Sequence, residues 1–301
     1  MVNITHKSFT LRKAIATALV QTSMQQTIDA IEQRKVPKGD IFEFARAAGL
    51  LAIKKTSDVI PDCHPLPVEY AAITYSVEGL SVLISVEVHT IYKTGVEVEA
   101  MHGASVAALV MYDMLKPIDK HVVISNIGLQ SKTGGKTDHK NSQITLKPAV
   151  VVCSDRVAKG EKQDASGKVL IAELEKHGLE CDQYLVIPDD FNTIQETLKK
   201  LHSEGHELIL FTGGTGLSDR DVTPDAIKPL LDREIPGIME TARNYGQLRT
   251  KYAMLSRGVA GFIGNTLVIT FPGSPNGVRE TMNALFPQVL HVFDVKSGDP
   301  H

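Results

Sequence analysis

The sequence is poor in cysteine, in excess positive charge and in long apolar runs, and each shortage excludes a class of protein. Its three cysteines, Cys63, Cys153 and Cys181, are too few and too scattered for a disulfide framework or a zinc site, which indicates a reducing cytoplasm. A formal net charge of −3 argues against a nucleic-acid-binding protein, because that function needs a basic surface. Any anionic ligand must instead be bound by local clusters of residues.

Long apolar segments are also missing. The first residues, MVNITHKSFTLRK, contain no apolar core of signal-peptide length, and the longest uncharged apolar run, residues 103–112, is far shorter than a membrane span. We therefore expect a cytoplasmic protein without membrane segments. The chain is long, and its 301 residues suit two domains of about 150 residues each.

The first half of the chain mixes helices and strands. Period-two alternation predicts a strand over residues 10–22, with Arg12 and the apolar residues at every second position after it on one face. Asp40 is a plausible N-cap for a helix whose buried face holds Ile41, Phe44, Ala45, Ala48 and Ala52. The other predicted elements are helices over 25–34 and 99–115 and strands over 69–78, 81–92 and 121–130.

The character of the sequence changes over residues 131–148, SKTGGKTDHKNSQITLKP. This segment is polar, rich in glycine and lysine and without sustained apolar periodicity, so we predict a linker or mobile loop. The second half then alternates between predicted strands (149–154, 182–188, 207–212, 266–272) and predicted helices (167–178, 193–205, and from about 276). Such alternation indicates a mostly parallel sheet with helices on both faces, and such sheets bind ligands beyond the carboxyl ends of their strands.

Polar loops follow four of these strands, and the longest is TGGTGLSDRDVTPDA at residues 212–226. Thr223 before Pro224 and Ser274 before Pro275 have the sequence of helix N-caps, so each helix start offers free N–H groups to a phosphate. The lysine of an ordinary phosphate loop is replaced here by carboxylates. A lone carboxylate would repel a phosphate, whereas Mg²⁺ is commonly held by one or two carboxylates together with substrate phosphates.

The loop at 212–226 therefore predicts a nucleotide whose charge is shared between backbone amides and a metal ion. Asp189 and Asp221 are the candidate metal ligands, while Asp190 and Asp225 are better explained as a helix cap or a surface charge. A glycine-rich turn before a capped helix can also be purely structural. The convergence of four polar loops favours the functional interpretation.

These residues, with DASG at 164–167 and the FPGSP turn, resemble the MogA/MoaB family of molybdenum cofactor biosynthesis over residues 149–295. The resemblance implies an α/β molybdopterin adenylyltransferase that uses ATP and Mg²⁺ and releases pyrophosphate. It implies that Asp189 and Asp221 are catalytic and bind the metal, and the intact RDVTPDA stretch favours an active enzyme. The nucleotide and molybdopterin contacts that it implies are Ser154, Asp155, Asp164, Ser166, Gly167, Thr212, Gly213, Gly214, Thr215, Gly216, Asp219, Ser274 and Pro275.

Three clusters stand out in the first half: KGD at 38–40, PDCHPLP at 61–67, and the stretch 93–116. Prolines make the second cluster stiff, which can aim His64. Glu97 and Glu99 share a face if they lie in a strand or turn, and Asp113 and Lys116 are neighbours on a helix. Each cluster alone has a simpler explanation, namely a turn and cap, a packed histidine or a surface ion pair of little energetic consequence.

Together, KGDIFEFARAAGL, KKTSDVIPDCHPL, KTGVEVEAM, ASVAALVMYDMLKPIDK and SKTGGKT resemble the MoaC family of cyclic pyranopterin monophosphate synthases over residues 1–137. The resemblance implies an α+β domain with an antiparallel sheet that rearranges a cyclic dihydro-GTP intermediate and expels pyrophosphate without a metal or other cofactor. It implies that Lys38 and Lys116 are catalytic and that Asp113 is their partner acid. The substrate contacts that it implies are Arg12, Cys63, His64, Glu97, Val98, Glu99, Lys132 and Lys136.

A lysine whose pKa is lowered by neighbouring positive charge would suit acid–base work in such a synthase. The sequence departs from the MoaC pattern at three places. Asp62 stands where the family usually has an apolar residue, Ala18 stands where it has a glycine, and GGKTD replaces GGKSG. Because the proposed catalytic residues are intact, we still expect synthase activity.

We therefore interpret the chain as a bifunctional enzyme with a synthase domain at 1–137, a linker at 138–148 and an adenylyltransferase domain at 149–301. Its expected partners are the cyclic dihydro-GTP intermediate, molybdopterin and ATP, with no nucleic acid and no membrane. MoaC proteins form hexamers and MogA/MoaB proteins trimers, so the resemblance implies a homo-hexamer with threefold symmetry. Sulfur insertion lies between the two reactions, so channelling is not implied.

Two alternatives remain open at this point. In the first, only the N-terminal synthase is active and the C-terminal half is a non-catalytic pterin-binding and oligomerising module, which ATP turnover would distinguish. In the second, the chain is a non-enzymatic scaffold or carrier of pterin intermediates, which substrate turnover at either site would eliminate.

Overall fold

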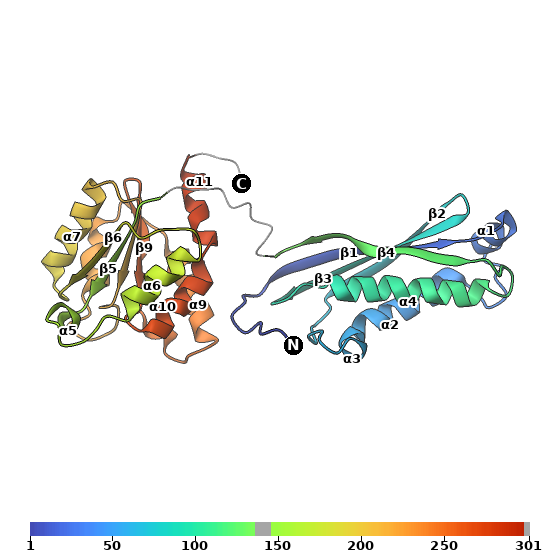
Figure 1. Cartoon of the computed structure of the whole chain (residues 1–301), viewed down its shortest axis with the longest axis horizontal. Coiled ribbons are helices and arrows are strands. Elements are labelled where there is room, and N and C mark those ends of the chain that lie inside the picture. Colours follow the sequence, from blue (N-terminus) through green and yellow to red (C-terminus); the bar gives the residue numbers. More distant parts are fainter. Residues whose placement is uncertain (136–145, 298–301) are drawn as a thin grey trace. The chain divides into compact units, whose positions relative to one another are not determined.

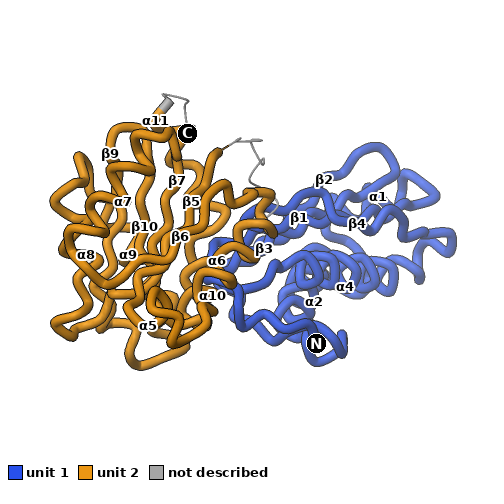
Figure 2. The backbone as a smooth tube through the Cα atoms, turned by 60° about the vertical axis from the view of Figure 1, so that its left-hand side comes forward, with its two compact units in different colours: residues 1–140 blue, residues 141–301 orange. Residues whose placement is uncertain are grey.

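The computed structural model describes residues 1–135 and 146–297. The chain divides into two compact units, Met1–Lys140 and Asn141–His301, which Figure 2 draws in different colours. Lys136 and most of the predicted linker fall outside the described residues. Within the described residues, no helix combines the length and the hydropathy that crossing a membrane requires.

The N-terminal unit is a four-stranded antiparallel sheet in the order β2-β3-β1-β4, with its two longest helices packed on one face (Figure 1). The strands are β1 (Thr10–Gln21), β2 (Tyr70–Glu78), β3 (Ser81–Tyr92) and β4 (Val123–Thr133). The helices are α1 (Gln25–Glu32), α2 (Ile41–Lys54), α3 (Thr56–Val59) and α4 (Glu97–Leu115). The predicted α+β class is confirmed.

Small residues bring the layers of this unit close together. The predicted alternation in β1 buries Ala14, Ala16, Ala18 and Val20 completely, or almost so, on the helix side. The buried face of α4 is likewise rich in alanine and glycine, and a side chain added at Gly103 would meet Ile53 of α2. The small residues therefore allow α4 to pack closely against α2.

Several details of the N-terminal prediction are wrong. The side chain of Phe44 is 57% exposed, whereas Phe42 packs against Tyr75, because two phenylalanines two positions apart cannot share one face of α2. Residues 131–133 belong to β4, so the predicted loop begins too early. The predicted loop also ends too late, because β5 already begins at Pro148.

The C-terminal unit is a six-stranded sheet in the order β6-β5-β7-β10-β9-β8 with helices on both faces (Figure 1). The strands are β5 (Pro148–Cys153), β6 (Gln183–Ile187), β7 (Leu208–Thr212), β8 (Arg233–Glu234), β9 (Ala260–Ile263) and β10 (Thr266–Phe271). The helices are α5 (Asp155–Ala158), α6 (Ser166–Glu175), α7 (Phe191–Ser203), α8 (Thr223–Ile227), α9 (Pro236–Gln247), α10 (Pro275–Leu285) and α11 (His291–Ser297).

Four neighbouring strands of this sheet, β6, β5, β7 and β10, run parallel, while β9 and β8 continue it in antiparallel fashion. The predicted mostly parallel α/β class is therefore confirmed. Helices α6, α9 and α10 pack on one face of the sheet and helices α7 and α8 on the other. The prediction missed β8 and β9, which are too short to show a periodic pattern.

Candidate functional site

The carboxyl ends of the four parallel strands lie at one edge of the sheet. Asp155, after β5, and Asp189, after β6, bind each other's backbone: each main-chain N–H donates to the other's carboxylate, at 3.1 and 3.2 Å. Gly213, after β7, donates its N–H to the Phe271 carbonyl at the end of β10, at 3.2 Å. The loops after these strands are therefore tied together.

The loop at residues 213–221, which we call the nucleotide loop, depends on glycine for its shape. Gly213 and Gly214 have φ angles of +103° and +59°, which side chains rarely adopt, and a side chain at Gly213 would also collide with the Cys153 carbonyl. Within the described residues, the N–H groups of Gly214, Thr215 and Leu217 donate no hydrogen bond. They are therefore available to an anionic ligand.

Two carboxylates flank this loop, and their environments differ. Asp189 accepts the Asp155 N–H through one oxygen, while its Oδ1 atom is buried and has no partner among the described residues. Burial raises the pKa of Asp189, and the neighbouring charges of Asp155 and Asp221 raise it further. Burial would also raise the pKa of Asp221, but hydrogen bonds from the Ser218 hydroxyl (2.6 Å) and N–H (2.8 Å) hold that pKa below the usual value.

One of the two predicted helix caps is wrong. Val222 occupies the N-cap position of α8 and no side chain caps that helix, while the Thr223 hydroxyl is buried beside Gly214 without a partner among the described residues. The second cap is confirmed: the Ser274 hydroxyl accepts the Gly277 N–H at 3.1 Å and Pro275 is the first residue of α10. The carboxyl end of β10 thus leads into a capped helix start.

The predicted contacts at 164–167 form a self-contained cap of α6. The Asp164 carboxylate accepts hydrogen bonds from the Ser166 hydroxyl (3.1 Å), the Gly167 N–H (3.0 Å), the Lys168 N–H (3.1 Å) and the Tyr184 hydroxyl (2.8 Å). These bonds outweigh burial and lower the pKa of Asp164. In this structure the carboxylate orients α6, and its oxygens are already engaged.

The remaining predicted contacts of the C-terminal unit also lie at the strand ends. The Ser154 hydroxyl caps α5 by accepting the Val157 N–H at 3.4 Å, and the Thr212 hydroxyl donates to the Pro272 carbonyl at 2.8 Å. Asp219 is exposed on the nucleotide loop. Asp190 caps α7 by accepting the Thr193 N–H at 2.8 Å, so its interpretation as a cap is confirmed.

A cavity of about 240 Å³ adjoins the start of α10. Its lining includes Arg243, Tyr252, Ser274 and Glu280. It offers polar groups of both signs and an aromatic ring beside the end of β10, which suits a flat polar ring system. A larger cavity of about 590 Å³ lies near the β9–β10 turn, at the opposite end of β10 from the strand ends, and does not touch the predicted residues.

In the N-terminal unit, the structure joins the three predicted catalytic residues. The Lys38 ammonium donates to the Asp113 carboxylate at 2.7 Å and to its carbonyl at 2.9 Å, and Lys116 pairs with the same carboxylate at 2.7 Å. Hydrogen bonds from Lys116 and Lys38 lower the pKa of Asp113 to about 2. The same carboxylate raises the pKa of Lys116, contrary to the expectation of a lysine pKa lowered by neighbouring positive charge.

The other predicted synthase residues gather around the start of α4. The Cys63 thiol donates to the Glu99 carboxylate at 3.3 Å, and Lys132 pairs with Glu97 at 3.0 Å. Glu99 is only 3% exposed, and its Oε2 atom has no partner among the described residues. Burial raises the pKa of Glu99. Burial is also the main reason why the pKa of Cys63 rises to about 11, and the charge of Glu99 adds to it.

The expectation that Glu97 and Glu99 share a face is wrong, because both lie in α4, where residues two positions apart point in different directions. The remaining predicted contacts are spread over this end of the unit. Val98 is exposed, His64 contacts the Val2 carbonyl at 2.8 Å, and Arg12 donates to the Tyr92 carbonyl at 3.4 Å.

The two synthase clusters lie at opposite ends of α4. Glu97 begins the helix and Asp113 lies in its last turn, so a rise of 1.5 Å per residue separates them by about 24 Å. Catalytic groups act within hydrogen-bond reach of the reacting atoms. One copy of the chain therefore does not bring both clusters to the same reacting centre.

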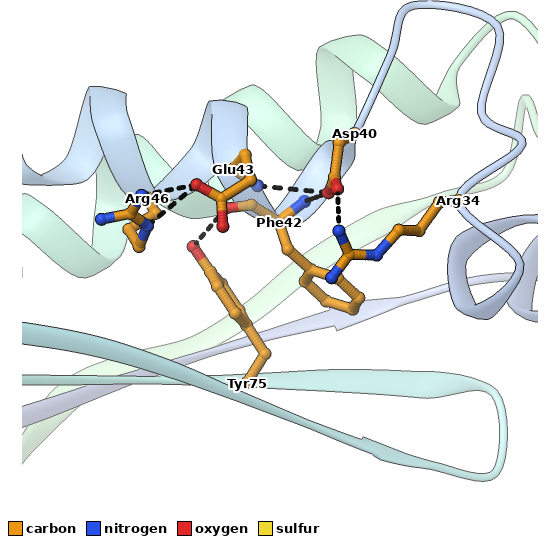
Figure 3. A network of polar contacts seen from close by, with 6 residues as sticks. All are labelled: Arg34, Asp40, Phe42, Glu43, Arg46 and Tyr75. Carbon is orange, nitrogen blue, oxygen red and sulfur yellow. Dashed lines mark hydrogen bonds and ion pairs between the residues drawn. The ribbon is translucent and has the colours of Figure 1, made fainter.

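A polar network fixes the loop that carries Lys38 (Figure 3). Asp40 caps α2 by accepting the N–H groups of Phe42 and Glu43, at 3.1 and 3.3 Å, and its other oxygen pairs with Arg34 at 2.7 Å. The Arg34–Asp40 pair therefore spans the segment between α1 and α2. The sequence predicted the cap, whereas the pairing with Arg34 left no local signal.

Sequence reasoning also missed Arg257, which lies between the 3₁₀ turn Ala253–Leu255 and β9. Its guanidinium donates to the Gly216 carbonyl at 2.7 Å, to the Asp221 carbonyl, and to both oxygens of Asp225 at 3.0 and 2.9 Å. An arginine inside an apolar stretch is the one available signal, because its partners lie more than thirty residues earlier in the chain.

Comparisons with known proteins agree with this division of the chain. Residues 1–135 match the MoaC family, and residues 149–291 match the family described as "Probable molybdopterin binding domain". A molybdenum cofactor biosynthesis bifunctional protein of Chlorobaculum tepidum is 38% identical over 301 residues, covering 100% of this chain and 96% of the relative. The chain belongs to the family of bifunctional molybdenum cofactor biosynthesis proteins.

Each half also has separate relatives. A cyclic pyranopterin monophosphate synthase of Clostridium perfringens is 42% identical over 143 residues, covering 47% of this chain and 90% of the relative. A solved structure of the molybdopterin biosynthesis enzyme MoaB from Thermus thermophilus is 39% identical, covers 52% of this chain and 99% of its own, and has a TM-score of 0.49. The two family matches and the full-length relative confirm the recognition made from the sequence for both halves.

Proposed function

We propose that this bifunctional protein carries two activities. The N-terminal unit converts the cyclic dihydro-GTP intermediate into cyclic pyranopterin monophosphate and releases pyrophosphate. The C-terminal unit transfers the adenylyl group of ATP to molybdopterin. The observation that carries the second activity is the nucleotide loop, where free N–H groups lie beside two carboxylates of unlike environment, Asp189 and Asp221.

The residues at this loop fit a magnesium ion. Within the described residues, no group of three or more histidine, cysteine, aspartate or glutamate side chains is arranged to hold a metal, but Mg²⁺ typically needs only one or two carboxylates besides phosphates and water. The buried Oδ1 atom of Asp189, which lacks a donor, would be one such ligand, and Asp221 would be the second. When bound, the ion would neutralise the triphosphate and the departing pyrophosphate.

The chain's own groups bind and orient the two substrates. The N–H groups of Gly214, Thr215 and Leu217 donate to phosphate oxygens of ATP. The pterin occupies the cavity lined by Tyr252 and Glu280, so that its phosphate lies at the start of α10. A phosphate oxygen of molybdopterin then attacks the α-phosphorus of ATP, and the bond to pyrophosphate breaks.

In the N-terminal unit, Lys38 and Lys116 supply the acid and base of the synthase reaction and neutralise the triphosphate. The Asp113 carboxylate holds both ammonium groups at 2.7 Å, which fixes their directions before substrate arrives. Glu99, buried and bound by Cys63, lines the other part of this site. Arg12, His64, Val98, Lys132 and Lys136 complete the proposed substrate contacts.

Anaerobic incubation with molybdopterin, ATP and Mg²⁺, followed by mass spectrometry, tests the second activity. Asp221→Ala should abolish the adenylylated product and leave the synthase unchanged, whereas Lys116→Ala should do the reverse, so each variant is the control for the other. A folded protein that binds the pterin without turnover would reduce the C-terminal unit to a binding module. No turnover at either site would leave a scaffold or carrier.

We also propose a homo-hexamer in which the synthase site is completed by two copies, because its clusters lie about 24 Å apart within one chain. Lys116→Ala and Glu99→Gln damage opposite ends of α4. If two copies share each site through a twofold axis, co-expression of the two inactive variants should restore about a quarter of the wild-type sites. No recovery, or a monomeric mass by light scattering, would contradict this assembly.

We further propose that the enzyme acts in the cytoplasm. The structure leaves Cys63, Cys153 and Cys181 as free thiols, which supports a reducing compartment. Its substrates are expected to be small pterin and nucleotide molecules rather than nucleic acid or lipid.

A further inference from the structure

We propose that Arg257 is a positioning residue that sets the direction of the peptide groups in the nucleotide loop. The inference rests on the proposed binding of ATP by that loop. Acceptors on four residues of the segment 215–225 converge on this one residue: its main-chain N–H donates to the Thr215 carbonyl at 3.0 Å, and its side chain binds Gly216, Asp221 and Asp225. Arg257 thereby connects both ends of the loop to the strand that follows it.

The effect on the loop follows from peptide geometry. In a trans peptide the C=O and N–H groups point in opposite directions. Because the carbonyls of Thr215 and Gly216 point toward Arg257, the next two N–H groups, of Gly216 and Leu217, point away from it. The Gly216 N–H lies on the side of the Asp221 carboxylate, whose pKa it helps to lower. Arg257 thus sets the direction of the Gly216 N–H, which faces Asp221, and of the free Leu217 N–H, which is left for phosphate.

Stability alone does not account for this arrangement. The Arg257 and Asp225 side chains are both partly exposed, and ion pairs of this kind contribute little to the free energy of folding. A guanidinium, in contrast, holds several acceptors in fixed directions, which a lysine ammonium does not reproduce. These hydrogen bonds engage Nε and both terminal nitrogens of Arg257, so the side chain acts through the loop rather than on phosphate itself.

Asp225 holds the Arg257 side chain in place. It lies on α8 and binds Arg257 through both carboxylate oxygens, so its negative charge holds the guanidinium in the orientation that the loop carbonyls require. The carboxylate interpreted from sequence as a cap or a surface charge therefore has a defined partner. Asp225→Asn should weaken the arrangement without removing the hydrogen bonds to Gly216 and Asp221.

Isothermal titration of the full chain with α,β-methylene-ATP and Mg²⁺ tests the inference without requiring turnover. Arg257→Ala should weaken binding by about tenfold or more, equivalent to the loss of about 1.4 kcal/mol, while Arg257→Lys and Asp225→Asn should have intermediate effects. Arg233→Ala, which removes an exposed arginine from β8, is the matched control and should bind as the wild type does.

A kinetic readout separates positioning from simple loss of structure. In Arg257→Ala the KM for ATP should rise while the KM for molybdopterin stays within about twofold, whereas general unfolding would reduce the active fraction without this difference. Unchanged binding of the analogue by Arg257→Ala would overturn the inference even if the wild type adenylylates molybdopterin. A wild type that binds the analogue but makes no product would overturn only the proposed transferase, and one that does not bind it would overturn both.

Discussion

At the scale of single residues, the N-terminal unit contains a buried carboxylate whose task is structural. Asp119 is 1% exposed and accepts hydrogen bonds from the Ser23 N–H and hydroxyl (both 2.7 Å), the His121 N–H (3.0 Å) and the Thr27 hydroxyl (3.2 Å). Asp119→Asn presents an NH₂ group to these donors, so it should destabilise the unit by about 2 kcal/mol. Calorimetry should detect this loss, and Asp58→Asn, at the surface, should cause little change.

The effect of Asp119 should also depend on pH. Burial raises the pKa of this group, but the bonds from Ser23, His121 and Thr27 outweigh it, so the folded pKa lies below the unfolded value of about 3.9. A lowered folded pKa adds stability above the unfolded pKa, and that stability is lost as the pH falls through the folded pKa. The gap in Tm between wild type and Asp119→Asn should therefore be constant near neutrality and narrow below about pH 4. A gap that widens in acid would contradict this assignment.

A second prediction at this scale concerns the lysines bound by Asp113. The Asp113 carboxylate raises the pKa of Lys116 by hydrogen bonding and by charge, so Asp113→Asn should lower that pKa. The basic limb of the synthase pH–rate profile should move to lower pH, and the rate should fall by about tenfold, less than the 10²- to 10⁴-fold loss expected for Lys116→Ala. Adenylyl transfer in the same sample is the internal control. An unshifted basic limb would mean that Lys116 does not titrate in the rate-determining state.

At the scale of elements, Asp40 connects helix formation to the position of Lys38 (Figure 3). Asp40→Ala removes the N-cap of α2, at a cost of about 1 kcal/mol, and releases Arg34 from the loop. Hydrogen exchange over residues 33–42 should quicken and synthase activity should fall. Arg46→Ala is the matched control, because it breaks only an exposed ion pair with Glu43 in the same network. Equal effects of the two substitutions would show that the cap does not position Lys38.

The same scale explains how far the sequence could predict the fold. Alternation in β1 and the apolar runs of β5, β7 and β10 identified these strands correctly, because burial on one or both faces leaves a periodic or continuous pattern. Phe44 was misplaced because apolar residues two positions apart leave the buried face of a helix ambiguous. The Thr223 cap failed because its hydroxyl is buried beside Gly214, a contact that no local pattern reveals.

The candidate sites were predictable to a different extent. Glycine-rich and acidic motifs drew attention to the nucleotide loop because its positive φ angles need glycine and its carboxylates lie close together in sequence. Arg257 and its partner Asp225 are 32 positions apart, and Lys38 and Asp113 are 75 apart, so their pairing depends on the packed fold. The distance between the two synthase clusters likewise emerged only when both were placed on α4.

At the scale of the whole molecule, each unit has its own hydrophobic core. All proposed synthase residues lie in the N-terminal unit, and all proposed transferase residues lie in the C-terminal unit. Cutting the chain into residues 1–140 and 141–301 should therefore give two folded proteins. Each should keep its own kcat/KM within about threefold of the intact chain, a change of less than about 1 kcal/mol, because no catalytic group is lost.

The mixture of the two fragments should match the intact protein in both assays, because each proposed site takes residues from only one of the two units. Light scattering of the fragment 1–140 decides how the first result is interpreted. A fragment that is active as a monomer would contradict the shared synthase site, because one copy leaves Glu97 and Asp113 about 24 Å apart. If the fragment forms an oligomer and has synthase activity, the N-terminal unit alone provides the assembly that the synthase reaction needs.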